Sequence, residues 1–148
     1  MTKYDDYVDF IIFGDGISSD VLSLVLKNAG KQFYVLGDDK IDKSADSPRS
    51  LALSPSSMNL LNFFGINFPV EKLKKMKVYE SDLSNDKTKG ELIFDNERIL
   101  SYVTKYYDLK KSLMKKTKAH KKKIESKNLS SIELDKDYIK IILEDGKI

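Results

Sequence analysis

One stretch near the start of the chain constrains the fold more than any other. It runs from Val8 to Asp20 and joins an apolar segment to a short turn built on Gly14 and Gly16. The turn leads directly into apolar residues that are spaced for a helix. A strand, a glycine turn and a helix in this order are the context of the phosphate-binding turn in dinucleotide-binding folds.

The glycine turn departs from the complete G-x-G-x-x-G pattern at one position. In that pattern the first glycine makes the tight turn, the second lets the backbone approach a pyrophosphate, and the third lets the helix pack closely on the strand. Gly14 and Gly16 fill the first two positions, whereas Ser19 stands in the third. Ser19 therefore adds a Cβ and a hydroxyl where close packing leaves little room.

The residues on both sides of the turn predict a β-α-β unit. We expect a strand over Tyr7 to Phe13, a helix from about Ser18 to Ala29 with Ser18 or Ser19 as its cap, and a second strand over Gln32 to Leu36. The first strand is almost continuously apolar, which favours a central position in a parallel sheet.

The remainder of the chain predicts a mixture of helices and antiparallel strands. Ser54 followed by Pro55 is typical of a helix start, and Gly65 is expected to end that helix. The other elements that we expect are a loop over 37–48, a strand over 76–80, a polar turn region over 81–90, a hairpin of 91–94 with 99–103, a helix over 108–118, and a hairpin of 129–134 with 138–143.

Composition excludes several classes of function. The chain has 148 residues, enough for one domain with a core, and its lack of cysteine excludes disulfides, thiol catalysis and thiolate metal sites. His120 lies among lysines and is expected to be a solvated surface residue, so we assign no metal site. No apolar segment approaches the ~20 residues that cross a membrane, and no leader pattern is present, which predicts a cytoplasmic protein.

Lysine is concentrated in one segment. Ten lysines fall between Lys105 and Lys127, against only Asp108 and Glu125. Such a segment can meet phosphate or an acidic membrane surface, although a solvated helix face is the simpler interpretation. Nucleic acid is not the expected partner, because the segment lacks arginine forks and interleaved aromatic residues.

A second block, from Ser47 to Ile66, gives the glycine turn a family context. It reads SPRSLALSPSSMNLLNFFGI and contains an arginine, an "ALS" sequence and a helix that ends in glycine. Shorter matches follow in the same order at 76–79, 102–103, 108–109 and 143–146. With these blocks the sequence resembles the N-terminal part of the FAD-dependent aromatic-ring hydroxylases, especially the ubiquinone-biosynthesis branch.

The resemblance implies an α/β fold and an incomplete domain. The implied fold is a partial, Rossmann-like FAD-binding fold, in which a parallel sheet with helices is joined by an antiparallel hairpin region. It implies a single incomplete FAD-binding domain over residues 1–148, in which residues 69–104 are an insertion similar to the start of the substrate-side sheet. Family members are much longer, so the resemblance also implies a truncated chain.

The resemblance implies FAD-binding roles for individual residues. Gly14, Gly16 and the backbone of Ile17 and Ser18 would face the FAD pyrophosphate, where amide groups and the helix dipole favour an anion. A plain tight turn is the alternative for the glycines. Arg49 would reach the phosphate or the ribityl chain; the alternative is a surface ion-pair partner. The backbone of Leu129 would bind adenine; the alternative is a core residue without a binding role.

The sequence departs from the family pattern where ribose and phosphate would bind. The acidic residue that normally ends the second strand falls at Gly37, so Asp38 is the candidate to replace it. Asp15 and Asp20 add negative charge beside the anion site. These departures predict weak or absent FAD binding.

Three functions remain open from the sequence. The first is an N-terminal piece of an FAD-dependent monooxygenase, inactive alone, which a second chain carrying the C-terminal half completes for an aromatic or quinone-precursor substrate. The flavin itself performs the hydroxylation in this family, so no residue here is nominated as catalytic. The alternatives are a non-enzymatic remnant and a lysine-rich module for nucleic acid or an anionic membrane. A peripheral position at the inner membrane would suit the monooxygenase.

Overall fold

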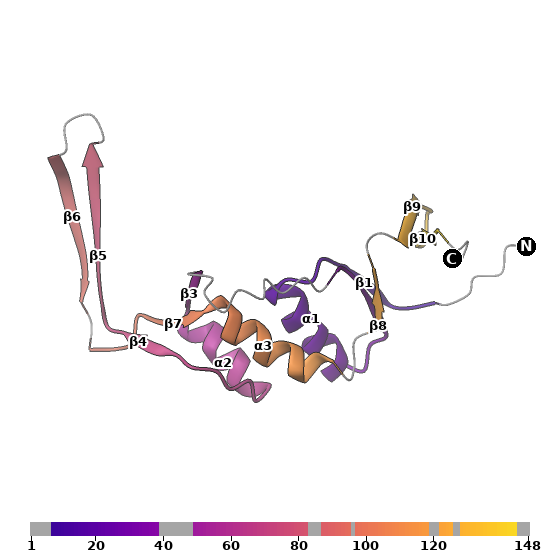
Figure 1. Ribbon diagram of the computed structural model, residues 1–148, viewed down its shortest axis with the longest axis horizontal. Coiled ribbons are helices and arrows are strands. Elements are labelled where there is room, and N and C mark those ends of the chain that lie inside the picture. Colours follow the sequence, from indigo (N-terminus) through magenta and orange to yellow (C-terminus); the bar gives the residue numbers. More distant parts are fainter. Residues whose placement is uncertain are drawn as a thin grey trace, which may run out of the picture. The chain divides into compact units, whose positions relative to one another are not determined.

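The chain forms two compact units. The computed structural model describes residues 7–38, 49–82, 87–95, 97–118, 122–125 and 128–144. The first unit comprises residues 1–42 and 113–148, and the second comprises residues 43–112 (Figure 1). The sequence-based division, a single domain with an insertion over 69–104, stays a prediction.

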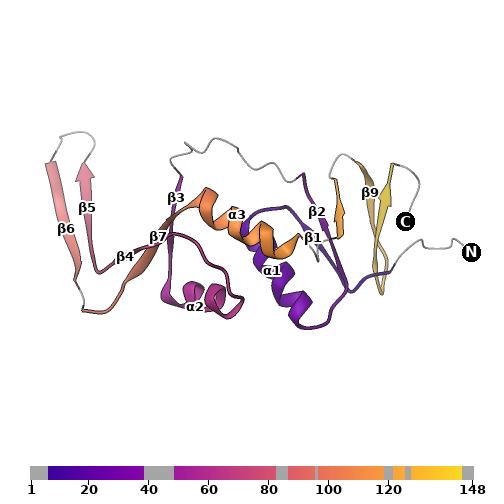
Figure 2. The same ribbon diagram turned by 60° about the horizontal axis from the view of Figure 1, so that its bottom comes forward.

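A parallel sheet forms the centre of the first unit. Its strands are β1 (Phe10–Phe13), β2 (Phe33–Leu36) and β8 (Lys122–Ile124), in the order β1-β2-β8. Both neighbouring pairs are parallel (Figure 2). Helix α1 (Ile17–Asn28) connects β1 to β2, which confirms the predicted β-α-β unit.

The core of this unit lies around β2 rather than β1. Ile12, Leu26, Phe33 and Val35 form a buried cluster, and Val35 is completely inaccessible. Phe10, by contrast, is 46% exposed. The expectation of a central first strand is therefore wrong among the described strands, because β2 lies between β1 and β8. A continuous apolar run does not by itself distinguish a central strand from an edge strand.

An antiparallel hairpin completes the described part of the first unit. Strands β9 (Leu129–Leu134) and β10 (Ile139–Leu143) pair as predicted. The turn between them is held by Asp135, whose Oδ1 accepts from the backbone N–H of Lys136 at 2.6 Å. This bond and one from the side chain of Tyr138 lower the pKa of the exposed Asp135 carboxyl.

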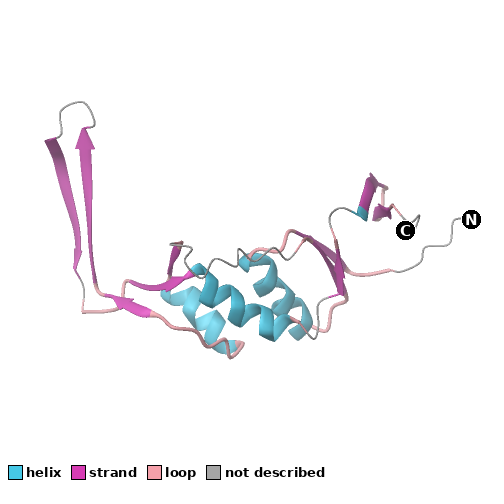
Figure 3. Ribbon diagram, in the orientation of Figure 1, coloured by secondary structure: helices cyan, strands magenta, loops and turns pink. Residues whose placement is uncertain are grey.

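The second unit combines helices with antiparallel strands (Figure 3). Strands β3 (Ser50–Leu53), β7 (Ser101–Lys105) and β4 (Glu71–Leu73) form one sheet in the order β3-β7-β4. Helix α2 (Pro55–Phe63) follows β3, and α3 (Tyr106–Thr117), which follows β7, has its residues beyond 112 in the first unit. No helix within the described ranges has the length and apolar character to cross a membrane.

The predicted start and end of α2 are confirmed. The Oγ of Ser54 accepts from the backbone N–H of Ser57 at 3.1 Å, and Pro55 occupies the first turn. Gly65 follows the helix with a φ of +66°, a conformation that glycine adopts without strain. Local capping chemistry therefore fixes both ends of this helix.

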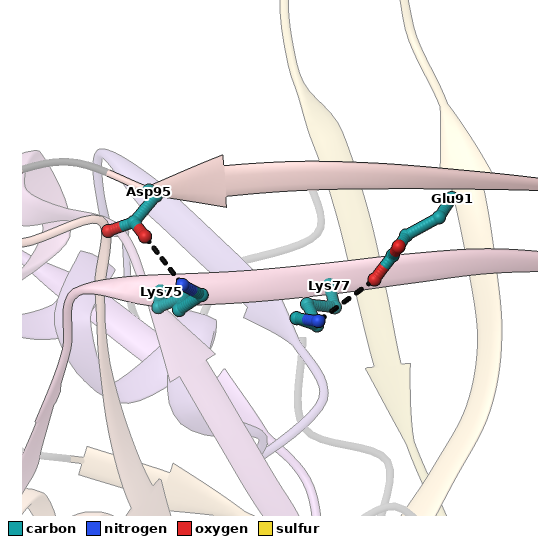
Figure 4. A network of polar contacts seen from close by, with 4 residues as sticks. All are labelled: Lys75, Lys77, Glu91 and Asp95. Carbon is teal, nitrogen blue, oxygen red and sulfur yellow. Dashed lines mark hydrogen bonds and ion pairs between the residues drawn. The ribbon is translucent and has the colours of Figure 1, made fainter.

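The predicted hairpin between 91–94 and 99–103 is wrong. Strand β6 (Lys87–Asp95) instead pairs with β5 (Lys75–Asp82), and β7 pairs with β3 and β4. Two cross-strand ion pairs support the β5–β6 register, Lys75 with Asp95 at 2.6 Å and Lys77 with Glu91 at 3.0 Å (Figure 4).

The predicted polar regions around these elements are shorter than expected or lie outside the described residues. The region predicted as a turn over 81–90 is occupied in part by the ends of β5 and β6, while 83–86 lie outside the described residues. Most of the loop predicted over 37–48 also lies outside them.

Candidate functional site

The turn between β1 and α1 is shaped by Gly14 and joined to the end of β2. Gly14 has a φ of +96°, a conformation that residues other than glycine rarely adopt. Its backbone N–H donates to the carbonyl oxygen of Leu36 at 2.8 Å, so the turn is tied to the end of β2. Glycine is therefore required at this position by the backbone, before any ligand is considered.

Replacing Gly14 with alanine is expected to lower the free energy of unfolding by about 1–3 kcal/mol, because φ alone would be strained. Among the described residues beyond its two chain neighbours, no atom lies within 4 Å of the position that the new Cβ would take, so a clash with them does not contribute. Urea denaturation measures the change. Gly90→Ala is the matched control, since it adds the same Cβ in open space without a positive φ. Equal stability of the two variants would contradict this account of the turn.

Gly16 begins the helix and leaves its first turn open. It is the N-cap of α1, with a φ of −68° and a ψ of 178°, and no side chain caps the helix there. In the part of the chain that the structure describes, no atom other than those of its chain neighbours lies within 4 Å of where its Cβ would stand. The first N–H groups of a helix have no partner within the helix, and they favour an anion. The backbone of Ile17 and Ser18 supplies such groups in this turn.

The prediction that Ser18 or Ser19 caps α1 is wrong, because the helix begins at Ile17 and includes both serines in its first turn. Ser19 is 8% exposed, and its Oγ has no hydrogen-bond partner among the described atoms. The position of the third glycine is therefore buried, as close packing requires, but an unsatisfied hydroxyl there costs roughly 1–3 kcal/mol.

The end of β2 meets the same turn. Gly37 is buried and donates its N–H to the carbonyl oxygen of Ile124 at 3.0 Å. A Cβ at position 37 would stand 2.8 Å from the Cβ of Asp15. Asp38 follows at an exposed position, and Asp20 is fully buried in the first turn of α1. Acidic residues thus lie within this turn and next to it in the chain, although its amide groups favour an anion.

The other two candidate residues belong to different parts of the chain. Arg49 lies in the second unit, where its Cζ is 4.4 Å from the centroid of the Tyr106 ring and its carbonyl oxygen accepts from the Tyr106 N–H at 2.9 Å. Leu129 is half-buried at the start of β9 and pairs with Leu143. Tyr106 was not expected to be the partner of Arg49, because this pairing joins residues far apart in the chain.

The lysine-rich segment does not form one helix face. Most of its described residues belong to the end of β7, to α3 and to β8. Lys110 is only 3% exposed. The interpretation of the whole segment as a solvated helix face is therefore wrong for these positions, because a third strand of the parallel sheet, β8, begins within it.

FAD, the cofactor that the resemblance implies, fits the backbone of the turn. The positive φ of Gly14, the open space over Gly16 and the start of α1 together form a place that a pyrophosphate can approach. The acidic residue expected at the end of β2 is replaced by Gly37. The fit is thus good for the pyrophosphate and altered at the ribose.

No protein-family model and no curated protein sequence matches the chain. Solved structures do match its fold. A probable FAD-dependent monooxygenase from Pseudomonas aeruginosa, pqsL, superposes with a TM-score of 0.68 at 15% identity over 96% of this chain and 40% of its own. The 2,6-dihydroxypyridine-3-hydroxylase of Arthrobacter nicotinovorans gives 0.61 at 17% identity over 93% and 33%.

A third solved structure carries the cofactor. HpxO of Klebsiella pneumoniae, in complex with FAD and uric acid, gives a TM-score of 0.58 at 14% identity and covers 93% of this chain and 35% of its own. Identities this low show the fold alone. The chain therefore has a mixed α/β fold similar to that of FAD-dependent monooxygenases, and it spans about a third of the length of most of these proteins.

Proposed function

We propose that the chain is the FAD-binding part of an FAD-dependent monooxygenase of the ubiquinone-biosynthesis type. One observation carries the proposal. The Gly14–Ser18 turn has a positive φ at Gly14 and an open helix start that suit a pyrophosphate, within a fold similar to that of FAD-dependent monooxygenases. Bound FAD would supply the hydroxylation chemistry, and the residues of this chain would bind and orient its ADP end.

The proposed contacts follow the pieces of the cofactor. The amide groups of the turn would hold the pyrophosphate, Arg49 the phosphate or ribityl chain, and the backbone of Leu129 the adenine. Asp38 is the candidate that the sequence alone offers for the ribose hydroxyls. The full set of proposed FAD-binding residues is Gly14, Gly16, Ile17, Ser18, Asp38, Arg49 and Leu129.

We propose that a further polypeptide, such as a second chain carrying the C-terminal half, completes the enzyme. The β5–β6 hairpin supports this idea. Its register puts Met76, Val78, Leu92 and Phe94 on one face, and each is between 39% and 56% exposed. An isolated two-stranded hairpin is marginal in water, so a covering surface would stabilise it.

The length of the chain relative to its structural neighbours bears on activity. Because the chain spans about a third of the neighbours' length, we propose that it is inactive alone and that an aromatic, quinone-precursor substrate binds only in the completed enzyme. A cytoplasmic location, peripheral to the inner membrane, belongs to the same proposal.

Titration with FAD, ADP and FMN tests the proposed cofactor site. The purified chain is expected to quench FAD fluorescence, and ADP is expected to displace FAD with similar affinity, because the proposed contacts other than that of Arg49 lie on the ADP end. FMN, which lacks that end, is expected not to compete. A folded chain that binds neither FAD nor ADP would overturn the proposal.

A non-enzymatic remnant is the second candidate function. The unsatisfied Oγ of Ser19 and the loss of the acidic side chain at Gly37 both favour weakened binding. This candidate predicts a folded chain that binds no nucleotide in the same titration.

A further inference from the structure

Asp15 and Gly37 form a close contact that ties the glycine turn to the end of β2. A Cβ built on Gly37 would stand 2.8 Å from the Cβ of Asp15, 3.2 Å from its backbone nitrogen and 3.3 Å from its Cγ. The shortest of these distances is one that real Cβ atoms essentially never show. A side chain at position 37 is therefore incompatible with Asp15 as it lies here.

The position of Asp15 beside Gly37 bears on which residue supplies a carboxylate at the end of β2. Gly37 leaves the end of β2 without a carboxylate, yet the Cγ of Asp15 lies beside the place where a side chain from position 37 would begin. Asp15 is half-buried, and Gly37 is buried. A carboxylate is thus present at this corner of the turn, and it comes from position 15 instead of position 37.

We propose that Asp15 accepts the hydrogen bonds of the ribose hydroxyls in the ADP part of the bound nucleotide. The inference rests on the proposed FAD-binding function and names the residue that sets its sugar specificity. A carboxylate has two acceptor oxygens, which suit the two donors of an unsubstituted ribose diol. The same charge disfavours a phosphate on the 2′-hydroxyl. The site therefore selects a ribonucleotide with a free diol.

The contact itself is tested without any nucleotide. Gly37→Ala is expected to lower the midpoint of urea unfolding, because its Cβ would meet Asp15. Adding Asp15→Gly is expected to reverse most of that loss, so that the two changes couple in a double-mutant cycle. Gly90→Ala, which adds a Cβ in open space, is the control. Additive effects of the two substitutions would show that the side chains do not meet, and would overturn the inference.

The role in binding is tested with ADP and 2′-deoxy-ADP. The unmodified chain is expected to prefer ADP, and Asp15→Asn is expected to weaken ADP about ten- to hundredfold and to remove the preference, as for a lost hydrogen bond to a charged group. Asp38→Asn is measured beside it, because Asp38 is the other candidate for the ribose. Asp137→Asn, at the exposed turn of the β9–β10 hairpin, is the control and is expected to keep the preference.

The outcomes separate this inference from the proposed function. If Asp38→Asn removes the preference and Asp15→Asn does not, or if the unmodified chain binds both nucleotides equally, the assignment of Asp15 is wrong while nucleotide binding stands. If the chain binds neither nucleotide, the proposed function is wrong and the inference fails with it.

Discussion

Gly16→Ala is expected to reduce FAD binding at least tenfold, and to lower the midpoint of urea unfolding less than Gly14→Ala does. Some loss of stability is expected because alanine is a poorer N-cap than glycine. The backbone of Gly16, with a φ of −68° and a ψ of 178°, has a conformation that any residue adopts. No described atom beyond its chain neighbours lies within 4 Å of the new Cβ. Folding therefore does not require glycine there. A methyl group would instead occupy the space through which a pyrophosphate approaches the start of α1.

The two glycines of the turn serve as controls for each other. Fluorescence titration with FAD measures binding, and urea denaturation measures stability, for Gly16→Ala and Gly14→Ala side by side. The first variant is expected to lose binding with a small loss of stability, whereas the second loses more stability because of the φ of +96° at Gly14. FAD binding by Gly16→Ala at the level of the unmodified chain would show that the pyrophosphate does not lie against Gly16.

Leu61→Ala is expected to lower the free energy of unfolding by about 2–5 kcal/mol, the largest effect on stability that we expect from a single substitution in α2. Leu61 is 3% exposed, so its removal leaves a cavity. Its neighbour Leu60 is 42% exposed on the same helix. Leu60→Ala removes the same side-chain atoms and changes helix propensity by the same amount, at a position that is much less buried than Leu61.

The comparison of the two leucines isolates packing from helix propensity. Urea denaturation of both variants is expected to give a loss below about 1 kcal/mol for Leu60→Ala, as for exposed positions in general. Similar losses in the two variants would mean that α2 does not bury the face that contains Leu61.

Local signals in the sequence predicted the elements of the fold that depend on local physics. The turn at Gly14 and the cap at Ser54 each follow from the chemistry of a few adjacent residues. The spacing of Leu109 and Leu113 likewise predicted one side of α3, and both side chains are completely buried.

Pairings between distant segments could not be predicted in the same way. Strand β6 was expected to pair forward along the chain, but it pairs with β5, and the three-residue strands β4 and β8 are too short to show a period. Strand formation depends on cross-strand neighbours more than on intrinsic preference. The stacking of Arg49 on Tyr106 has the same long-range origin.

The candidate site was predicted in part for the same reason. The positions of Gly14 and Gly16 follow from their motif, whereas Asp15 looked only like an unfavourable charge beside an anion site. Its contact with Gly37 joins residues from two strands' ends and has no signature in either segment alone. Because of that contact, Asp15 is a candidate ligand group as well as a departure from the motif.

The central claim is that the turn from Gly14 to Ser18 binds the pyrophosphate of a dinucleotide. The most direct measurement is a titration of the ¹⁵N-labelled chain with ADP, followed by the backbone amide resonances. The account predicts that the largest shifts fall on the amides of Gly14, Gly16, Ile17 and Ser18. Shifts confined to the lysine-rich segment between Lys105 and Lys127, or no shifts at saturating ADP, would contradict it.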